Sequence, residues 1–173
     1  MKNYKELLEN ITTFIFDYDG VLTEGIITLT ESGEPLRTAN VRDGYALQLA
    51  AKKGYRIAVI SGGKSKSMSN RLASLGIKHV FLGIENKVEV FNKFLSDQGI
   101  TSDEVMYMGD DIPDFHVMQA AAVAACPADA AEEIKKISVY ISHFKGGKGC
   151  VRDIIEQVLK LQNNWMNDDA FKW

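Results

Sequence analysis

The sequence contains little cysteine and no excess of basic residues. Cys126 and Cys150 are its only cysteines, and they lie far apart, so we expect neither a zinc site nor a disulfide framework. Lysine and arginine together number 20 against 23 aspartates and glutamates, which gives a formal net charge of −3. Clustered cations supply most of the affinity for a nucleic-acid backbone. The charge balance therefore argues against a protein that binds nucleic acid through a broad basic face.

Long apolar segments are also missing. The longest unbroken apolar run, residues 120–126, is much shorter than the roughly 20 residues that cross a bilayer. Residues 1–10 contain no apolar segment typical of a signal peptide. Of the 173 residues, 46% are hydrophobic and 25% are charged, as in ordinary globular proteins. We therefore expect one soluble, cytoplasmic domain over residues 1–173 that makes no membrane contact.

Short apolar runs alternate with helical patterns along the chain. The runs predict buried strands at residues 12–16, 55–60, 78–82, 105–108, 123–125 and 139–141. Apolar residues at helical spacing predict helices that begin near 43, 64, 88, 113, 128 and 151. Such alternation favours right-handed crossovers. The sequence therefore predicts an α/β fold, a doubly wound and mostly parallel sheet with helices on both faces.

Two segments do not follow this alternation. Residues 25–30 and 36–41 flank a turn rich in glycine and proline, which predicts a β-hairpin insertion at about 24–41. The tail, about residues 162–173, is polar but contains Trp165, Phe171 and Trp173. We expect a frayed terminus there. The alternative is an aromatic tail that docks on a partner subunit.

Polar side chains follow four of the predicted strands. They are Asp17 and Asp19 after the first, Ser61 after the second, Lys87 shortly after the third, and Asp110, Asp111 and Asp114 after the fourth. Ligands of a doubly wound sheet bind outside the carboxyl ends of its strands. Any one of these acids, taken singly, is more simply explained as a turn or cap residue. Their convergence on one edge of the sheet indicates a site.

Converging acids require a cation. Like charges about 4 Å apart repel by roughly 4 kcal/mol at an effective dielectric constant of 20. Oxygen ligands without histidine or cysteine suit Mg²⁺. Ser61 and the two glycines that follow it precede a predicted helix, which makes a plausible phosphate seat. Lys87 is either a solvated surface residue or the cation that a phosphoryl-transfer site needs.

Four segments together resemble, in order, the four signatures of the haloacid dehalogenase-like phosphatases. They are residues 17–23 (DYDGVLT), Ser61, Lys87 and residues 109–114 (GDDIPD). The resemblance implies a Mg²⁺-dependent phosphotransferase in which Asp17 attacks phosphorus and forms an aspartyl-phosphate. Asp19 would protonate the leaving oxygen and then activate water.

The resemblance also implies three groups of residues around the phosphoryl group. The metal ligands would be Asp17, the backbone carbonyl of Asp19, and Asp110. The phosphate-binding residues would be Ser61, Gly62 and Lys87. The acids that orient the metal shell would be Asp111 and Asp114.

The resemblance can be narrowed to a subgroup. Only residues 20–60 separate the first two signatures, which leaves room for the hairpin and one helix but not for a cap domain. Residues 40–45 (NVRDGY), 146–149 (GGKG) and 151–152 are similar to the capless 3-deoxy-D-manno-octulosonate 8-phosphate phosphatases. That subgroup implies a homotetramer in which the hairpins associate and a neighbouring subunit covers each site. A site without its own lid needs another way to exclude water.

The substrate implied is the phosphate monoester of a keto-deoxy sugar acid, most simply 3-deoxy-D-manno-octulosonate 8-phosphate. The residues that would contact it are Asp19, Asn40, Val41, Arg42, Asp43, Gly44, Gln48, Gly63, Lys64 and Arg71. Arg42 has the clearest chemical reason, because arginine pairs bidentately with carboxylate or phosphate. Arg71 alone would be interpreted as a solvated helix residue.

Two positions depart from the subgroup. Gly63 and Gln48 stand where the octulosonate enzymes usually or often have arginine. Losing these two cations leaves the phosphoryl chemistry intact and affects sugar specificity. We hypothesise that Lys64 compensates. The alternative substrate is a 9-carbon keto-deoxy sugar acid 9-phosphate.

Two other classes of protein remain as alternatives. A phosphoryl-receiver signalling domain also uses acids, a hydroxyl, a lysine and Mg²⁺, but its phosphorylated aspartate is on the third strand. Residues 81–83, at the end of that strand, contain no aspartate. A catalytically silent scaffold is the other class, although every catalytic-type position is filled. The histidines are scattered and are assigned no ligand role: His79, His116 and His143.

Overall fold

The computed structural model describes residues 4–172 of the chain and contains a six-stranded sheet with the order β5-β4-β1-β6-β7-β8. Its strands are β1 (Thr13–Phe16), β4 (Arg56–Ser61), β5 (His79–Leu82), β6 (Val105–Met108), β7 (Val123–Cys126) and β8 (Tyr140–Ile141). Every neighbouring pair in this sheet is parallel. The predicted α/β fold is confirmed.

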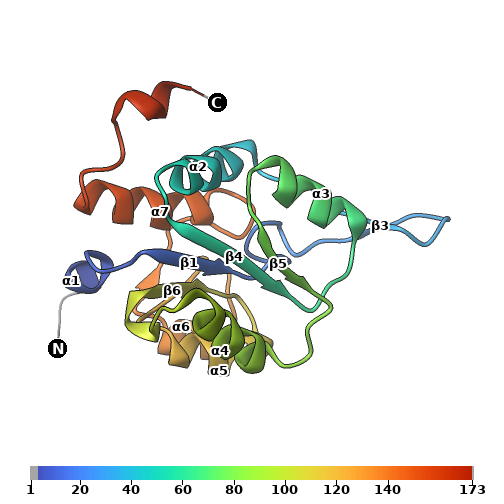
Figure 1. Cartoon of the computed structure of the whole chain (residues 1–173). Helices are drawn as coiled ribbons and strands as arrows, with labels where there is room; N and C mark the ends of the chain where they lie inside the picture. The colour runs from blue at the N-terminus through green and yellow to red at the C-terminus, as the bar shows by residue number, and fades with distance from the viewer. Residues whose placement is uncertain (1–3, 173) are drawn as a thin grey trace.

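Helices cover both faces of the sheet (Figure 1). One layer consists of α1 (Tyr4–Leu8), α2 (Val41–Lys52), α3 (Lys66–Ser74) and α7 (Cys150–Leu161). The other layer consists of α4 (Lys87–Gln98), α5 (Phe115–Ala120) and α6 (Glu132–Ile137). Three short 3₁₀ segments are η1 (Ser102–Glu104), η2 (Ile112–Asp114) and η3 (Asp168–Phe171). Among the described residues, no helix combines the length and apolarity that a membrane span requires.

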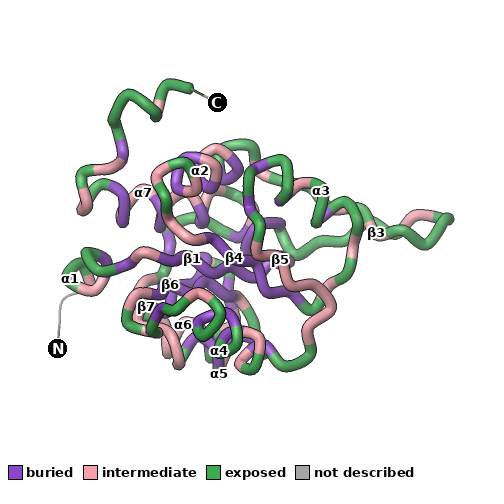
Figure 2. The backbone as a smooth tube through the Cα atoms, viewed as in Figure 1, coloured by how far each residue is buried: buried purple, intermediate pink, exposed green. Residues whose placement is uncertain are grey.

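The central strand β1 shows why this arrangement forms. Phe14 and Phe16 are fully buried toward α2 and α7, whereas Ile15 is fully buried toward the layer of α4, α5 and α6. A parallel strand that is covered on both faces needs a continuous apolar run. Figure 2 shows the resulting band of buried residues through the sheet.

Several element boundaries differ from the prediction. The helix expected from residue 128 begins at Glu132, because the backbone N–H groups of Ala128 and Ala131 donate to the carbonyls of Phe144 and Asp110 instead. Helix α2 begins at Val41 rather than at 43, because the side chain of Asn40 caps it. The prediction also missed α1, which is only five residues long.

The hairpin is present but shorter than predicted. Its strands, β2 (Thr28–Leu29) and β3 (Pro35–Leu36), form only two antiparallel residue pairs. The hairpin extends away from the body of the molecule (Figures 1 and 2). Its apolar residues Ile26 and Leu29 are 68% and 85% exposed. The hairpin therefore contributes little to the core of this chain.

The tail is not frayed over its described part, so that prediction is wrong. Trp165 is buried, with its ring nearly perpendicular to that of Tyr45 and the Arg152 guanidinium 5.3 Å from its centroid. The Tyr45 hydroxyl donates to the carbonyl of Ala170, within η3. The tail therefore packs on α2 and α7 of its own chain. Trp173 lies outside the described residues.

Candidate active site

The topology creates a crevice at the centre of the sheet. The chain passes from β1 to β4 and β5 on one side, and then returns to β6 on the other side of β1. Ligands bind at such a switch point, outside the carboxyl ends of the strands. Asp17 directly follows β1, and Asp110 lies two residues after β6. Both acids therefore lie at this crevice.

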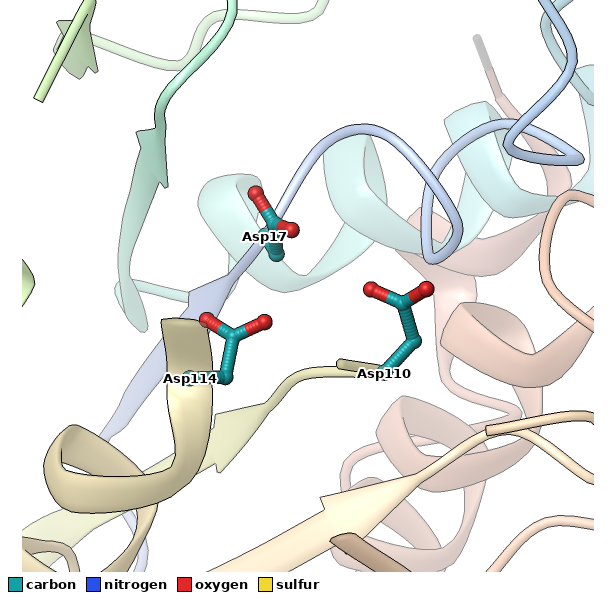
Figure 3. A group of neighbouring side chains, drawn as sticks. All are labelled: Asp17, Asp110 and Asp114. Atoms are coloured by element: carbon teal, nitrogen blue, oxygen red, sulfur yellow. The ribbon is translucent and has the colours of Figure 1, made fainter. Parts of the chain in front are cut away.

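Three carboxylates converge there. Each of Asp17, Asp110 and Asp114 offers one oxygen, and these oxygens all lie within 4.8 Å of one another. Figure 3 shows the three side chains facing a common space. Gly20 permits this arrangement, because a Cβ added there would lie 2.0 Å from an Asp110 carboxylate oxygen, and because its φ of +88° disfavours other residues.

Burial and repulsion between neighbouring carboxylates make Asp17 and Asp110 hard to ionise. Burial raises the pKa of Asp17 to about 7, with a further contribution from Asp114, while Lys87 opposes the shift. Burial also raises the pKa of Asp110 to about 7, with contributions from Asp17 and Asp114. A divalent cation between the carboxylates would reverse this effect.

Asp114 is held by two donors on one oxygen only. Lys87 Nζ lies 2.7 Å from Asp114 Oδ1 and 3.2 Å from Asp17 Oδ1. The hydroxyl of Tyr107, a fully buried residue, donates to the same Asp114 oxygen at 2.8 Å. Asp114 Oδ2 is buried and has no hydrogen-bond partner. This oxygen is therefore free to serve a cation or its bound water, and the donor set fits Mg²⁺.

The large cavity at this edge has a volume of about 600 Å³. It is lined by all the predicted catalytic, phosphate-binding and metal-site residues, which are Asp17, Asp19, Ser61, Gly62, Lys87, Asp110, Asp111 and Asp114. Gly63, which was predicted to contact the substrate, lines it as well. Ser61 ends β4 and is 1% exposed, and its hydroxyl accepts from the Gly63 N–H at 3.2 Å. Asp111 is exposed and caps η2 through the N–H of Ile112.

Asp19 has a partner that the sequence analysis missed. Arg37 Nε lies 2.6 Å from Asp19 Oδ1, and Arg37 Nη2 lies 2.9 Å from Asp19 Oδ2. Tyr107 was missed as well, because a tyrosine in an apolar strand is indistinguishable from a core residue. A basic residue directly after the hairpin was the only signal for Arg37, and it does not indicate which acid is the partner.

None of the residues in the predicted substrate segment 40–44 lines this cavity. The Asn40 side chain caps α2 and donates to the Gly147 carbonyl at 3.0 Å. Asp43 Oδ1 accepts from the Arg152 N–H at 2.7 Å, at the beginning of α7. Asn40, Asp43, Gly44 and Arg71 line a separate cavity of only about 20 Å³. The segment therefore joins α2 to α7.

Four predicted substrate residues, two of them within segment 40–44, lie apart from the acids. Val41 and Arg42 are exposed and line a surface groove with Lys148. Gln48 is half-buried on α2, and Lys64 is exposed, with its aliphatic part against Gly83. Neither Gln48 nor Lys64 lines the large cavity.

Comparisons with known proteins agree with this geometry. Residues 44–128 match the family model described as haloacid dehalogenase-like hydrolase. The chain is 38% identical over 154 residues to the 3-deoxy-D-manno-octulosonate 8-phosphate phosphatase KdsC of Salmonella typhi, covering 89% of this chain and 82% of that protein. It is 37% identical to KdsC of Escherichia coli strain K12, again over 89% of this chain and 82% of that protein.

Two solved structures are similar along almost the whole chain. One is the 3-deoxy-D-manno-octulosonate 8-phosphate phosphatase from Moraxella catarrhalis in complex with a magnesium ion, a phosphate ion and a KDO molecule. Its TM-score is 0.92 and its identity 32%, covering 99% of this chain and 97% of that one. The other is the cobalt-bound phosphatase YrbI from Haemophilus influenzae, with a TM-score of 0.90, 32% identity, and 95% and 98% coverage.

Proposed function

This chain belongs to the haloacid dehalogenase-like hydrolase family, and from that premise we propose that it hydrolyses 3-deoxy-D-manno-octulosonate 8-phosphate to the free sugar acid and phosphate. The observation that carries this proposal is the cluster of Asp17, Asp110 and Asp114 beside Lys87, in a cavity of about 600 Å³. The identity to octulosonate 8-phosphate phosphatases supports the substrate class.

The reaction proceeds in two steps. A carboxylate oxygen of Asp17 attacks phosphorus, the bond between phosphorus and the sugar oxygen breaks, and Asp19 gives its proton to that leaving oxygen. Water then attacks phosphorus and gives a proton to Asp19. The bond between phosphorus and Asp17 breaks, which releases inorganic phosphate and restores the Asp17 carboxylate.

The other residues prepare the phosphoryl group. The Ser61 hydroxyl and the Lys87 ammonium bind its oxygens, and Lys87 also favours the ionised form of Asp17. Asp17, Asp110, the backbone carbonyl of Asp19 and the free oxygen of Asp114 are the groups that would hold or orient Mg²⁺. When bound, Mg²⁺ neutralises the acids and polarises the phosphoryl oxygens.

The hairpin supports an oligomer. Ile26, Leu29 and Leu36 are 68%, 85% and 53% exposed on a two-stranded projection. Exposed apolar patches of this kind mark interfaces, and the cavity has an open side. We therefore propose a homotetramer in which the hairpins associate and a neighbouring subunit covers each site. Leu29→Lys should yield smaller assemblies in analytical ultracentrifugation, and an unchanged mass would contradict this role of the hairpin.

A phosphate-release screen tests the function. We expect the 8-carbon keto-deoxy sugar acid phosphate to have the highest kcat/KM, with strict dependence on Mg²⁺, and hexose phosphates to serve as controls. Gly63 and Gln48 place no cation at two positions that are usually or often arginine in the octulosonate enzymes. The screen therefore includes the 9-carbon 9-phosphate, and a preference for it would change the assigned substrate. Equal rates with hexose phosphates would overturn the proposal.

A further inference from the structure

The ion pair between Arg37 and Asp19 connects the hairpin to the cavity. Arg37 directly follows Leu36, the last residue of β3. Its Nε donates to Asp19 Oδ1 at 2.6 Å, and its Nη2 donates to Asp19 Oδ2 at 2.9 Å. The Arg37 side chain is only 6% exposed, whereas that of Asp19 is 28% exposed. The contact is therefore a largely buried, bidentate ion pair rather than a solvent-exposed one.

Arg37 holds Asp19 from the hairpin side of the cavity. Asp19 lines the cavity and Arg37 does not. The Thr23 hydroxyl adds a third donor, at 3.3 Å from Asp19 Oδ1. A Cβ added at Gly63 would lie 3.0 Å from Asp19 Oδ2 and 3.5 Å from Arg37 Nη2. Gly63 therefore leaves the space that the pair occupies, and the carboxylate of Asp19 has one well-defined orientation.

We propose that Arg37 is a positioning residue that fixes the orientation of the Asp19 carboxyl group at the cavity. In the protonated form that the first step uses, one Asp19 oxygen keeps its contact with the guanidinium and the other carries the proton that passes to the leaving-group oxygen. This inference rests on the function proposed above. Because Arg37 directly follows β3, the orientation of Asp19 also depends on the position of the hairpin relative to the sheet. Association of the hairpins in an oligomer would then order the proton donor of the same chain. A planar guanidinium suits this task better than an ammonium, because its donors match both carboxylate oxygens.

Variants at Arg37 and at a distant arginine test the proposal. Arg37→Gln removes both the positive charge and the bidentate donor geometry of the guanidinium. Arg37→Lys keeps the charge but not that geometry. Arg56→Gln is the matched control, because Arg56 is the first residue of β4 and lies at the opposite edge of the sheet. Circular dichroism verifies that each variant folds.

Two leaving groups separate a proton-transfer role from other roles. The sugar oxygen of an alkyl phosphate needs a proton as it leaves, whereas p-nitrophenolate leaves without one. With the best alkyl substrate, Arg37→Gln should lower kcat by about 100-fold, the loss expected for a misplaced catalytic group. Its KM should change less than about threefold, and Arg37→Lys should recover part of kcat. In the first turnover of p-nitrophenyl phosphate, nitrophenolate release should slow by less than about threefold.

Other outcomes would overturn the proposal. Equal losses with both leaving groups would indicate a merely structural role, and a rise in KM alone would indicate a substrate contact. If the wild type prefers another alkyl phosphate, the proposed substrate fails, but the same measurements with that phosphate still test Arg37.

A measurement without turnover tests the ion pair itself. The Nε–H group of Arg37 should give a slowly exchanging signal in the nuclear magnetic resonance spectrum of the wild type. Asp19→Ala should abolish that signal, whereas Arg56→Gln should keep it. A wild-type signal that is absent, or one that survives Asp19→Ala, would contradict the geometry on which the inference rests.

Discussion

Two regions of the molecule contain buried acids with raised pKa values, but only one of them has the geometry of a reactive site. Burial raises the pKa of Asp43 to about 6 and that of Asp17 to about 7. Asp43 is a single acid that accepts from the Arg152 N–H, and its cavity of about 20 Å³ holds one water at most. Asp17 faces two other acids and a cavity of about 600 Å³.

The difference shows which property identifies a site. Asp43 Oδ2 and Asp114 Oδ2 are both buried and without a partner, so an unpartnered carboxylate oxygen does not distinguish the two regions. Asp43 caps α7, whose own N-cap residue is Gly149 and has no side chain to do so. Three acids that converge on a cavity, in contrast, cap no helix and repel one another, so their arrangement does not stabilise the fold. It is this convergence that makes the cavity beside Asp17 the candidate active site.

The strongest test of the comparison removes the proposed nucleophile, Asp17. Asp17→Asn should lower kcat by more than about 1000-fold, because the amide cannot form the phosphorylated intermediate. Phosphate release measures the loss, and circular dichroism should show an unchanged fold. Asp97→Asn is a matched control, since Asp97 is an exposed residue of α4. Substantial turnover by Asp17→Asn would assign the nucleophile elsewhere.

Metal should stabilise the acid cluster in a pH-dependent way. Asp17 and Asp110 have folded-state pKa values of about 7 against 3.8 for the ordinary group. Between about pH 4 and 7 the native state therefore binds more protons than the unfolded state, so metal-free stability should fall as the pH rises through this window.

Saturating Mg²⁺ should therefore raise Tm more at pH 8 than at pH 5. At about 100 times its Kd the metal adds about 2.7 kcal/mol, which is about 5 to 10 °C for a chain of this size. Thermal unfolding with and without Mg²⁺ at both pH values provides the measurement. Equal shifts at pH 5 and pH 8 would show that protons and metal do not compete for this cluster.

Two substitutions should change stability in opposite directions in the metal-free protein at pH 8. Asp110→Asn removes one repelling charge and should raise the free energy of unfolding by about 1 to 2 kcal/mol. Asp43→Ala leaves buried N–H groups at the start of α7 without an acceptor and should lower it by about 1 to 3 kcal/mol. Denaturant titrations measure both, and changes of the same sign would erase the distinction between the two regions.

The smallest effect should come from the hydroxyl that orients Asp114. Tyr107→Phe removes one of two donors to Asp114 Oδ1 and leaves Lys87 in place. The concentration of Mg²⁺ for half-maximal activity, and the Kd of Mg²⁺ by calorimetry, should rise about tenfold. Tyr140→Phe is the control, because its hydroxyl contacts Asp153 instead. Unchanged affinity for Mg²⁺ would make Tyr107 a core residue only.

Much of the fold and of the catalytic cluster could be predicted from the sequence. The apolar runs and their helical or strand spacing are local, so β1, β6 and α7 were predicted to within two residues. The acids could be assigned to one edge because parallel strands end together. The predicted membership of the haloacid dehalogenase-like phosphatases is confirmed by the comparisons.

The partners of these residues could not be predicted in the same way. Three contacts join residues that share no local sequence pattern. They are those of Arg37 with Asp19, of Tyr107 with Asp114, and of Asp43 with the start of α7. The prediction for the tail failed for a similar reason. Only the arrangement of α2 and α7 shows that a surface exists on which Trp165 can pack.

The amino-acid sequence by itself determined the alternation of strands and helices and the edge of the sheet at which the acids gather, because periodic burial acts over neighbouring residues. Only the tertiary structure decided which acids face one another and which hairpin residue holds Asp19. Those choices depend on distances of a few ångströms between distant segments, and the free energy of a charged or hydrogen-bonded contact changes steeply over that range.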